Sequence, residues 1–508
     1  MKNIRFGFLV RAVLGLGLIL IGDALRGQSE RVGDNARHQV LFAFDDTALP
    51  FQQGVKLQLV PYRTPLGDGR NADNIAIPLG KPGTPDSNGT TYYPGTVCEV
   101  NGELWMWYNG LGDQDVSRHP RLCFAKSKDG VHWEKPDLGL VDYNGNKHNN
   151  LVDIGSSVSA CVIFYEPDSP DANRRFKMAF EGKYGLFISV AYSADGLRWT
   201  ESPGNPKTHI KFEAAGGVKW QGAYYLTGQG GVNWAPNGWR NLVTHMSYDF
   251  EHWTELTTLG FRRDPEPPRA VTSRGSTDGE QVHLGAGLWN RGNVILGFYG
   301  QWHGAPNNDL RWVSMDTGFI ISHDALHYTE PVPDFRMIEA AGSVAWFGPY
   351  AQALPIYRAP AIAHGQGFAN VGNQTLFWYS LWGAPGEGIR IARWERDRLG
   401  YSQPFVPGKK QPSIISEPLV TGGRAATISL NVSGLDESNG IKVSVLDEQF
   451  RELPDYTAGG CSGSGLRQQV RWGTQERITS EQPIRIRIDF TGASAQELRL
   501  YAVYLDAE

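Results

Sequence analysis

A short phrase recurs four times along the chain and constrains its fold more than any other feature. The copies run from Ser127 to Trp133, Ser193 to Trp199, Ser247 to Trp253 and Ser322 to Tyr328. Each copy places an aspartate two residues after the serine and an aromatic residue at its end. A degenerate fifth copy lies between Arg393 and Tyr401. Because an aspartate side chain accepts backbone N–H bonds and closes a tight turn, we interpret the phrase as a fold marker.

A pair of strand-like segments precedes each copy of the phrase. The five pairs begin near Gly95, Ala160, Gly216, Gln281 and Ala359. Repeats longer than those of a helical solenoid, with strand-rich content, indicate propeller blades. The 61 glycines and 16 tryptophans agree with many hairpins and much aromatic packing. The sequence therefore predicts an all-β chain with a five-bladed β-propeller over residues 85–408.

The segments on either side of the predicted propeller differ from it in pattern. Residues 28–84 hold two short strand candidates, and we expect them to lead into the ring or to supply a closing strand. Residues 409–508 alternate apolar and polar side chains, for example from Thr427 to Val432. Such alternation is typical of strands with one solvated face, so this part is predicted to be a β-sandwich.

The first 27 residues have the pattern of an export signal. Lys2, Arg5 and Arg11 precede an uncharged, largely apolar run from Ala12 to Gly22, which is too short to span a bilayer. We expect a cleaved signal peptide and a secreted or periplasmic protein with no further membrane contact; an uncleaved tether is the alternative. The formal net charge of −5 gives no electrostatic case for nucleic acid. We expect a monomer without a cofactor.

The chain has only four cysteines. Cys98 and Cys123 are expected on nearby strands of one blade, so they could pair in an oxidising compartment. The alternative is that the four thiols are buried as small hydrophobic groups. No cysteine spacing resembles a metal site or a redox pair.

The predicted blades, the Ser-x-Asp-Gly-x-x-Trp turns and the C-terminal sandwich together resemble the glycoside hydrolases of families 32, 43, 68 and 130. The layout is most similar to that of family 32, and the resemblance implies a secreted enzyme that acts on carbohydrate. The segment from Phe212 to Leu226 is similar to the third-blade segment of family 43, which implies that Glu213 is a general acid. The triplet Arg263-Asp264-Pro265 matches one in family 32, which implies that Asp264 stabilises the transition state.

The chain departs from these families at the start of the first inner strand. Where they place a catalytic aspartate, this sequence has Thr91-Tyr92-Tyr93. A different carboxylate must serve, or the mechanism differs, or the protein is not a hydrolase.

Hydrolysis of a glycosidic bond generally needs two carboxyl groups that flank the bond. In a propeller, the groups that can meet around a sugar lie where inner strands start and second strands end. Glu213 is the first candidate for the acid and Glu280 for the second carboxylate, while Glu181 is a candidate polar wall or proton-relay partner.

Residues that would contact a sugar are expected at the same strand ends. Aromatic rings stack on sugar faces, and arginine can bind a carboxylate or sulfate. The predicted substrate-binding residues are Tyr93, Asp278, Trp302, His303, Arg269, Arg358 and Trp382. A metal site of His283, Glu280 and His303 lacks any recognisable ligand spacing, so no metal is predicted.

Three function classes follow from these observations. The leading prediction is a glycoside hydrolase with a two-carboxylate mechanism in the axial pocket of the propeller. The alternatives are a non-catalytic carbohydrate-binding propeller and a propeller glycoside phosphorylase or lyase.

Overall fold

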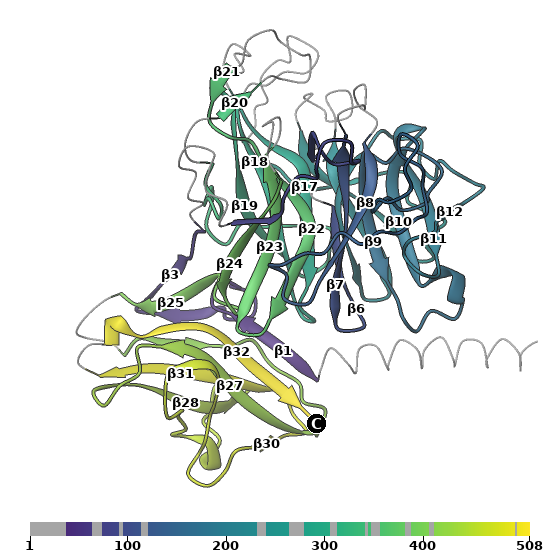
Figure 1. Cartoon of the computed structure of the whole chain (residues 1–508). Coiled ribbons are helices and arrows are strands. Elements are labelled where there is room, and N and C mark those ends of the chain that lie inside the picture. The colour runs from purple at the N-terminus through teal and green to yellow at the C-terminus, as the bar shows by residue number, and fades with distance from the viewer. Residues whose placement is uncertain are drawn as a thin grey trace, which may run out of the picture.

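The computed structural model describes residues 37–62, 74–90, 95–112, 120–230, 240–263, 279–304, 312–340, 344–346, 356–381, 388–405, 411–492 and 495–508. Within these residues the regular structure is almost entirely β-strand (Figure 1). The helical segments among them are single 3-10 turns: η2 (Ala172–Arg174), η4 (Pro454–Tyr456) and η5 (Ala495–Glu497). The predicted all-β class is confirmed.

Between residues 75 and 395 the strands pair mostly with their neighbours in sequence, as antiparallel meanders. The first group comprises β5 (Gly89–Thr90), β6 (Thr96–Val100), β7 (Glu103–Leu111) and β8 (Arg121–Ser127). The second comprises β9 (Ala160–Tyr165), β10 (Phe176–Gly182), β11 (Gly185–Ser193) and β12 (Thr200–Glu201). The third comprises β13 (Glu213–Trp220), β14 (Ala223–Gly230), β15 (Asn241–Ser247) and β16 (Thr258–Phe261). The fourth comprises β17 (Glu280–Asn290), β18 (Ile295–His303) and β19 (Ser314–Ser322). The fifth comprises β22 (Ile362–Val371), β23 (Gln374–Leu381), β24 (Ile389–Glu395) and β4 (Ile75–Ile77).

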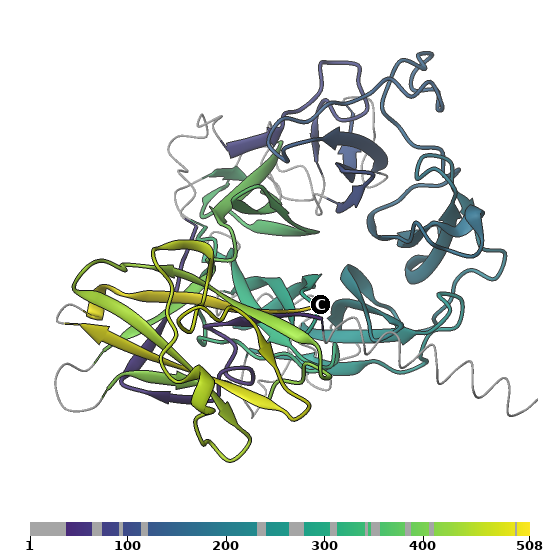
Figure 2. The same ribbon diagram turned by 90° about the horizontal axis from the view of Figure 1, so that it is seen from below.

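One strand of each group lies on the inside of the molecule. These inner strands are β6, β9, β13, β17 and β22, and each contacts the next in a closed series, with β22 returning to β6. The return is a parallel contact in which Gln366 pairs with Thr96. Figure 2 shows the groups following one another in chain order around a common axis. A small separate sheet of β20 (Val344–Trp346) and β21 (Ile356–Arg358) lies at one end of the molecule (Figure 1).

The inner strands approach one another closely because small residues and one glutamine lie between them. A Cβ atom added to Gly216 of β13 would lie 1.9 Å from the carbonyl oxygen of Ala286 in β17. The Gln366 side chain accepts hydrogen bonds from the backbone N–H groups of Gly217 and Leu288 at 3.0 and 2.9 Å. Its amide also donates to the carbonyl oxygens of the same two residues, both at 2.9 Å. Gln366 of β22 therefore joins β13 and β17 by four hydrogen bonds.

The recurring phrase forms the turn that the sequence predicts. In the first copy, one Asp129 oxygen accepts the backbone N–H groups of Val131 and His132 at 2.9 and 2.8 Å. The Ser127 hydroxyl oxygen accepts from the Gly130 N–H at 2.8 Å, and Gly130 has a φ of +74°. The same bonds recur at the equivalent serine and aspartate of the later copies. The phrase is confirmed as a structural turn.

The degenerate fifth copy has a different role. Its Asp397 is buried, forms an ion pair with Arg291 at 2.6 Å and accepts a hydrogen bond from the Tyr504 hydroxyl at 2.9 Å. Arg291 follows β17, whereas Tyr504 belongs to β32, the last strand of the chain. Asp397 thus links β32, in the larger C-terminal sheet, to the end of β17 in the fourth group.

Two further sheets form the C-terminal part of the molecule and draw strands from both ends of the chain (Figure 1). The larger sheet contains β1 (His38–Phe42), β3 (Val55–Leu59), β25 (Gly400–Pro404), β27 (Ala425–Ser433), β29 (Gly465–Gln469), β30 (Ile478–Thr479) and β32 (Arg499–Ala507). The other contains β2 (Phe51–Gln53), β26 (Ser413–Ile415), β28 (Asn439–Asp447) and β31 (Ile484–Gly492). Apolar residues of both sheets pack in one buried cluster, which includes Ile428, Val443 and Ile488.

The N-terminal segment reaches both parts of the molecule. Strands β1 to β3 join the C-terminal sheets, while β4 pairs with β24 at the outer edge of the fifth group. After β1, the buried Asp45 carboxylate lies 3.0 Å from Nε2 of His323, which belongs to the fourth turn phrase. Hydrogen bonding to Asp45 raises the pKa of His323.

The possible pairing of Cys98 with Cys123 does not occur. Cys98 lies on β6 and Cys123 on β8, and β7 pairs between these two strands. No disulfide joins the described cysteines, and burial raises the pKa of the Cys98 thiol to about 12. Among the described residues, no helix has the length and apolar character needed to cross a membrane.

Candidate active site

The predicted acids lie where inner strands begin and a second strand ends, and Glu181 and Glu213 interact with each other. Glu213 is the first residue of β13, Glu280 is the first residue of β17, and Glu181 is the next-to-last residue of β10. Glu181 reaches β13 directly, because its Oε1 accepts the backbone N–H of Ala214 at 2.9 Å. Strands β13 and β17 contact each other, so the three acids lie on neighbouring parts of the ring.

Glu181 and Glu213 form an interacting carboxyl pair. Glu181 is only 4% exposed, and its Oε2 accepts a hydrogen bond from the Ser159 hydroxyl at 3.2 Å. Burial raises the pKa of Glu181 well above its ordinary value, and a negative charge on Glu213 raises it further. Burial also raises the pKa of Glu213, although the charge of Arg240 and a hydrogen bond from Gln229 oppose this rise. The pair therefore holds a proton more strongly than two exposed glutamates would.

Gln229 links this pair to the next inner strand. It lies opposite Glu213 in the β13–β14 register, and its amide nitrogen donates to the Glu213 carboxylate. Its amide oxygen accepts the backbone N–H of Leu284 in β17 at 3.1 Å. One side chain thus fixes the orientation of Glu213 relative to the strand that begins with Glu280.

Arg240 supplies a positive charge beside the carboxyl pair. Its guanidinium lies 5.3 Å from the centre of the Trp302 ring and contacts the amide oxygen of Gln281 at 3.4 Å. Burial lowers the pKa of Arg240, and the charge of Glu213 opposes this change. Sequence reasoning missed Arg240, because an arginine at the start of a third strand has no local signal that sets it apart.

Glu280 has the opposite environment to Glu213. Its Oε2 lies 2.6 Å from Nη2 of Arg263 and 2.7 Å from Nδ1 of His303. Burial alone would raise the pKa of Glu280, but the His303 hydrogen bond and the Arg263 charge outweigh it and hold the pKa below its ordinary value. Glu280 is therefore kept as a carboxylate.

His303 connects Glu280 to a second, fully buried carboxylate. Its Nε2 lies 2.8 Å from Asp316, which also forms an ion pair with Arg336 at 3.1 Å. Burial lowers the pKa of His303, but the hydrogen bonds to Asp316 and Glu280 raise it above the ordinary value overall. His303 was predicted to line the substrate pocket, and its observed contacts are with these two carboxylates. Sequence reasoning missed Asp316, which lies on the third strand of its sheet.

Trp302 was predicted to lie on the rim of the pocket, and its burial does not fit that role. It is 1% exposed, and its ring stacks on His283 at 5.1 Å with an interplanar angle of 13°. It packs with apolar residues at the starts of the inner strands, such as Ala160 and Ala215. A residue at a strand end can face either side of the sheet, and here Trp302 faces inward while His303 faces Glu280.

Two buried histidines, His283 and His364, lie on the neighbouring inner strands β17 and β22. Burial, with the nearby Arg240 and His364, lowers the pKa of His283 well below its ordinary value. Burial lowers the pKa of His364 to about 4. Both imidazoles are therefore neutral near pH 7. Within the part of the chain that the structure describes, no group of three or more His, Cys, Asp or Glu side chains could hold a metal ion.

Several predicted site residues fall outside the described residues: Tyr93, Asp264, Arg269, Asp278 and Trp382. Arg358 lies in β21, where its backbone pairs with Val344. The adjoining Arg263 of the Arg-Asp-Pro triplet is described, and it takes part in the site through its ion pair with Glu280.

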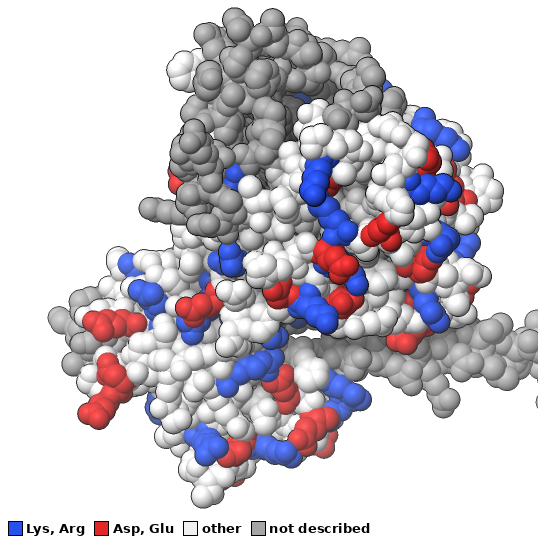
Figure 3. Space-filling model, in the orientation of Figure 1, with Lys and Arg blue, Asp and Glu red and all other residues white. Residues whose placement is uncertain are grey.

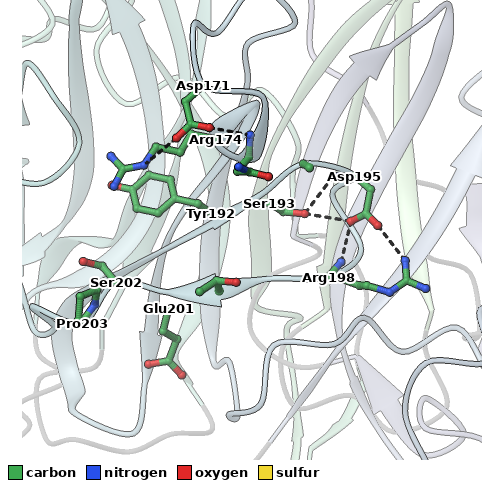
Figure 4. A pocket seen from close by; sticks show the side chains of 12 residues that line it. Asp171, Arg174, Tyr192, Ser193, Asp195, Arg198, Glu201, Ser202 and Pro203 are labelled. Atoms are coloured by element: carbon green, nitrogen blue, oxygen red, sulfur yellow. Dashed lines mark hydrogen bonds and ion pairs between the residues drawn. The ribbon is translucent and has the colours of Figure 1, made fainter.

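A surface hollow lies on the outer strands of the second group, away from the candidate acids (Figure 4). It is lined by Arg174, Tyr192, Asp195 and Glu201, among others. Asp195 there accepts the backbone N–H groups of its own turn, and the Arg174 guanidinium covers the Tyr192 ring at 4.1 Å. These polar groups hold the fold, so we do not assign the hollow a ligand. On the face seen in Figure 3, the described Lys and Arg side chains are interspersed with Asp and Glu.

The chain is similar to several known proteins, and no family model matches it. Two uncharacterised proteins from two strains of Mycobacterium tuberculosis are each 25% identical to it over 174 residues, which are 31% of this chain and 51% of theirs. The chain thus spans about half the length of the curated relatives it matches.

Several of the solved structures to which the chain is similar are described as glycoside hydrolases. A glycosyl hydrolase from Bacteroides ovatus is 15% identical, with a TM-score of 0.42 over 67% of this chain and 95% of that one. A Bombyx mori GH32 β-fructofuranosidase is 11% identical, with a TM-score of 0.37 over 86% of this chain and 93% of that one. A structure from a study of the GH130 family of mannoside phosphorylases and hydrolases is 15% identical, with a TM-score of 0.41 over 67% and 95%.

Proposed function

We propose that this protein is an exported glycoside hydrolase whose five sheet groups are the blades of a β-propeller, followed by a C-terminal β-sandwich. The substrate is an oligo- or polysaccharide, and the reaction uses carboxyl groups at the end of the axis where β13 and β17 begin. Export, the monomeric state and the absence of a cofactor belong to the same proposal.

The observation that supports this proposal best is that two carboxyl groups at the starts of adjacent inner strands, Glu213 and Glu280, have surroundings that shift their pKa values in opposite directions. Glu213 has a raised pKa and Glu280 a lowered one. Two titratable groups whose surroundings move their pKa values apart divide into an acid and a base. Glu213 is the general acid, and Glu280 activates water or attacks the sugar.

Glu181 and Arg240 support the acid. Glu181 accepts the backbone N–H of Ala214 and its pKa is raised by the charge of Glu213, while the charge of Arg240 favours ionisation of Glu213 and opposes the rise in its pKa. Asp264 as a transition-state stabiliser, and Tyr93, Asp278, Arg269, Arg358 and Trp382 as substrate contacts, remain predictions.

The test is to compare Glu213→Gln, Glu280→Gln and the parent on a panel of aryl glycosides and plant or algal glycans. Each substitution is expected to lower kcat/KM by about a thousandfold, since a positioned acid or base contributes 10²–10⁴-fold. Glu134→Gln is the control, because Glu134 is exposed on the outer part of the first group and should retain full activity. Full turnover in both site variants would reject the assignment.

The same assay separates the alternative functions. Binding of glycans without turnover by the parent would favour a carbohydrate-binding protein. Turnover that depends on inorganic phosphate would indicate a phosphorylase, and an unsaturated, ultraviolet-absorbing product would indicate a lyase. For a hydrolase, the anomeric configuration of the first product, read by NMR, distinguishes retention from inversion.

A further inference from the structure

An exposed tryptophan stands at the same end of the fourth group as Glu280. The Trp312 side chain is 73% exposed, which is unusual for a residue that is highly buried on average. Trp312 lies two residues before Ser314, the first residue of β19. Sequence reasoning singled out other tryptophans and did not select this one.

The register of the fourth group sets the position of Trp312 relative to the acids. Glu280 pairs with His303 across β17 and β18, and His303 pairs with Ser314 across β18 and β19. Two strand spacings outward and at most two extended residues along the chain place the Trp312 backbone about 10–12 Å from that of Glu280. Trp312 therefore lies outward from Glu280, at the same end of the fourth sheet.

The exposed indole has the chemistry of a sugar contact. An indole offers a large flat apolar surface, and the axial C–H groups of a sugar ring pack against such surfaces. Its polar N–H can at the same time reach a hydroxyl group or water. Tyr248 is equally exposed, at 74%, but it follows the last residue of β15 at the opposite end of its sheet, away from Glu213.

We propose that Trp312 is a stacking platform for the sugar unit next to the one held by Glu213 and Glu280, so that the ligand is an oligosaccharide or polysaccharide chain that runs outward over the fourth sheet. This inference rests on the proposed function and adds to it the position of a second subsite. It assigns Trp312 a binding role and no part in bond cleavage.

The experiment measures binding apart from catalysis. Calorimetry on the Glu213→Gln protein compares monosaccharides with oligosaccharides of increasing length prepared from fructan, arabinan, xylan and mannan. Trp312→Ala in this background is expected to weaken oligosaccharide binding about tenfold, from the value of one aromatic contact. Trp312→Phe should recover part of the loss, and Tyr248→Ala is the matched control with no effect.

Each outcome decides the proposal. A loss confined to the longer ligands and to Trp312 supports the platform, even if the parent hydrolyses none of the glycans, in which case only the hydrolase proposal fails. Equal affinities for parent and Trp312→Ala overturn the platform. So does an equal loss for monosaccharides, an equal loss in Tyr248→Ala, or the absence of any oligosaccharide binding by the parent background.

Discussion

Replacing Gln366 with alanine tests how the ring holds its candidate acids. The Gln366 side chain makes four hydrogen bonds of 2.9–3.0 Å to the backbones of β13 and β17, at Gly217 and Leu288. A hydrogen bond of this kind contributes about 1 kcal/mol net, so four give about 4 kcal/mol. Because the Gln366 side chain is partly exposed, water can replace some of these bonds in the variant. We expect Gln366→Ala to lower the free energy of unfolding by about 3 kcal/mol.

Urea unfolding followed by tryptophan fluorescence measures this change, since tryptophans are distributed through the sheets. The control is Gln374→Ala, because Gln374 lies in the same strand pair but is exposed. A loss of less than about 1 kcal/mol, or a loss equal to that of the control, would refute the role assigned to Gln366. Because β13 and β17 begin with Glu213 and Glu280, Gln366→Ala should also lower kcat more than it raises KM.

Three other predictions follow from charged groups. The pH profile of kcat/KM should be bell-shaped. Activity should fall as pH rises through the raised pKa of Glu213, which loses its proton, and as pH drops through the lowered pKa of Glu280, which gains one. A profile that changes in one direction only would contradict these roles. Asp397→Ala should lower the free energy of unfolding by about 3–5 kcal/mol, because it leaves the Arg291 guanidinium without its buried partner. An unchanged free energy of unfolding would contradict the linking role of Asp397. The pKa of His323 is higher in the folded protein than in the unfolded chain, so protonation of His323 stabilises the fold. This stabilisation is complete at pH values below the pKa of the unfolded chain and is lost as pH rises through the pKa of the folded protein. His323→Gln should therefore remove this part of the pH dependence of the free energy of unfolding.

Local features of the fold were predictable from the sequence because they are encoded within a few residues. The turn phrase specifies its own hydrogen bonds through Ser127 and Asp129, so its copies mark the sheets in order. Glu213 and Glu280 were predictable as strand starts, since each precedes a recognisable apolar strand. Pairings between segments that are far apart in the sequence were not predictable. β1 pairs with β32 from the other end of the chain, with His38 opposite Asp506, and no local pattern specifies this contact.

The candidate site shows the same limit. Arg240, Asp316 and the Arg263 ion pair belong to third strands and loops, where charged residues are common and only the three-dimensional register brings them together. The side of the sheet that the Trp302 side chain faces could not be predicted from the sequence either, because a residue at a strand end can face the core or the solvent. Patterns thus located the strand ends that carry the acids, while the groups that set the ionisation of those acids required the structure.

The ionisation of the acid pair can be argued from charge alone. Glu181 and Glu213 are drawn together by the bond to Ala214, and Arg240 is the cation beside them. Two carboxylates and one guanidinium would leave an uncompensated negative charge in a largely buried region, whereas a pair that retains one proton balances the guanidinium. The pair therefore retains a proton to higher pH than two exposed glutamates would, whichever of the two residues carries it. Because Glu213 is the more exposed of the two, a ligand at the start of β13 would contact the pair at Glu213.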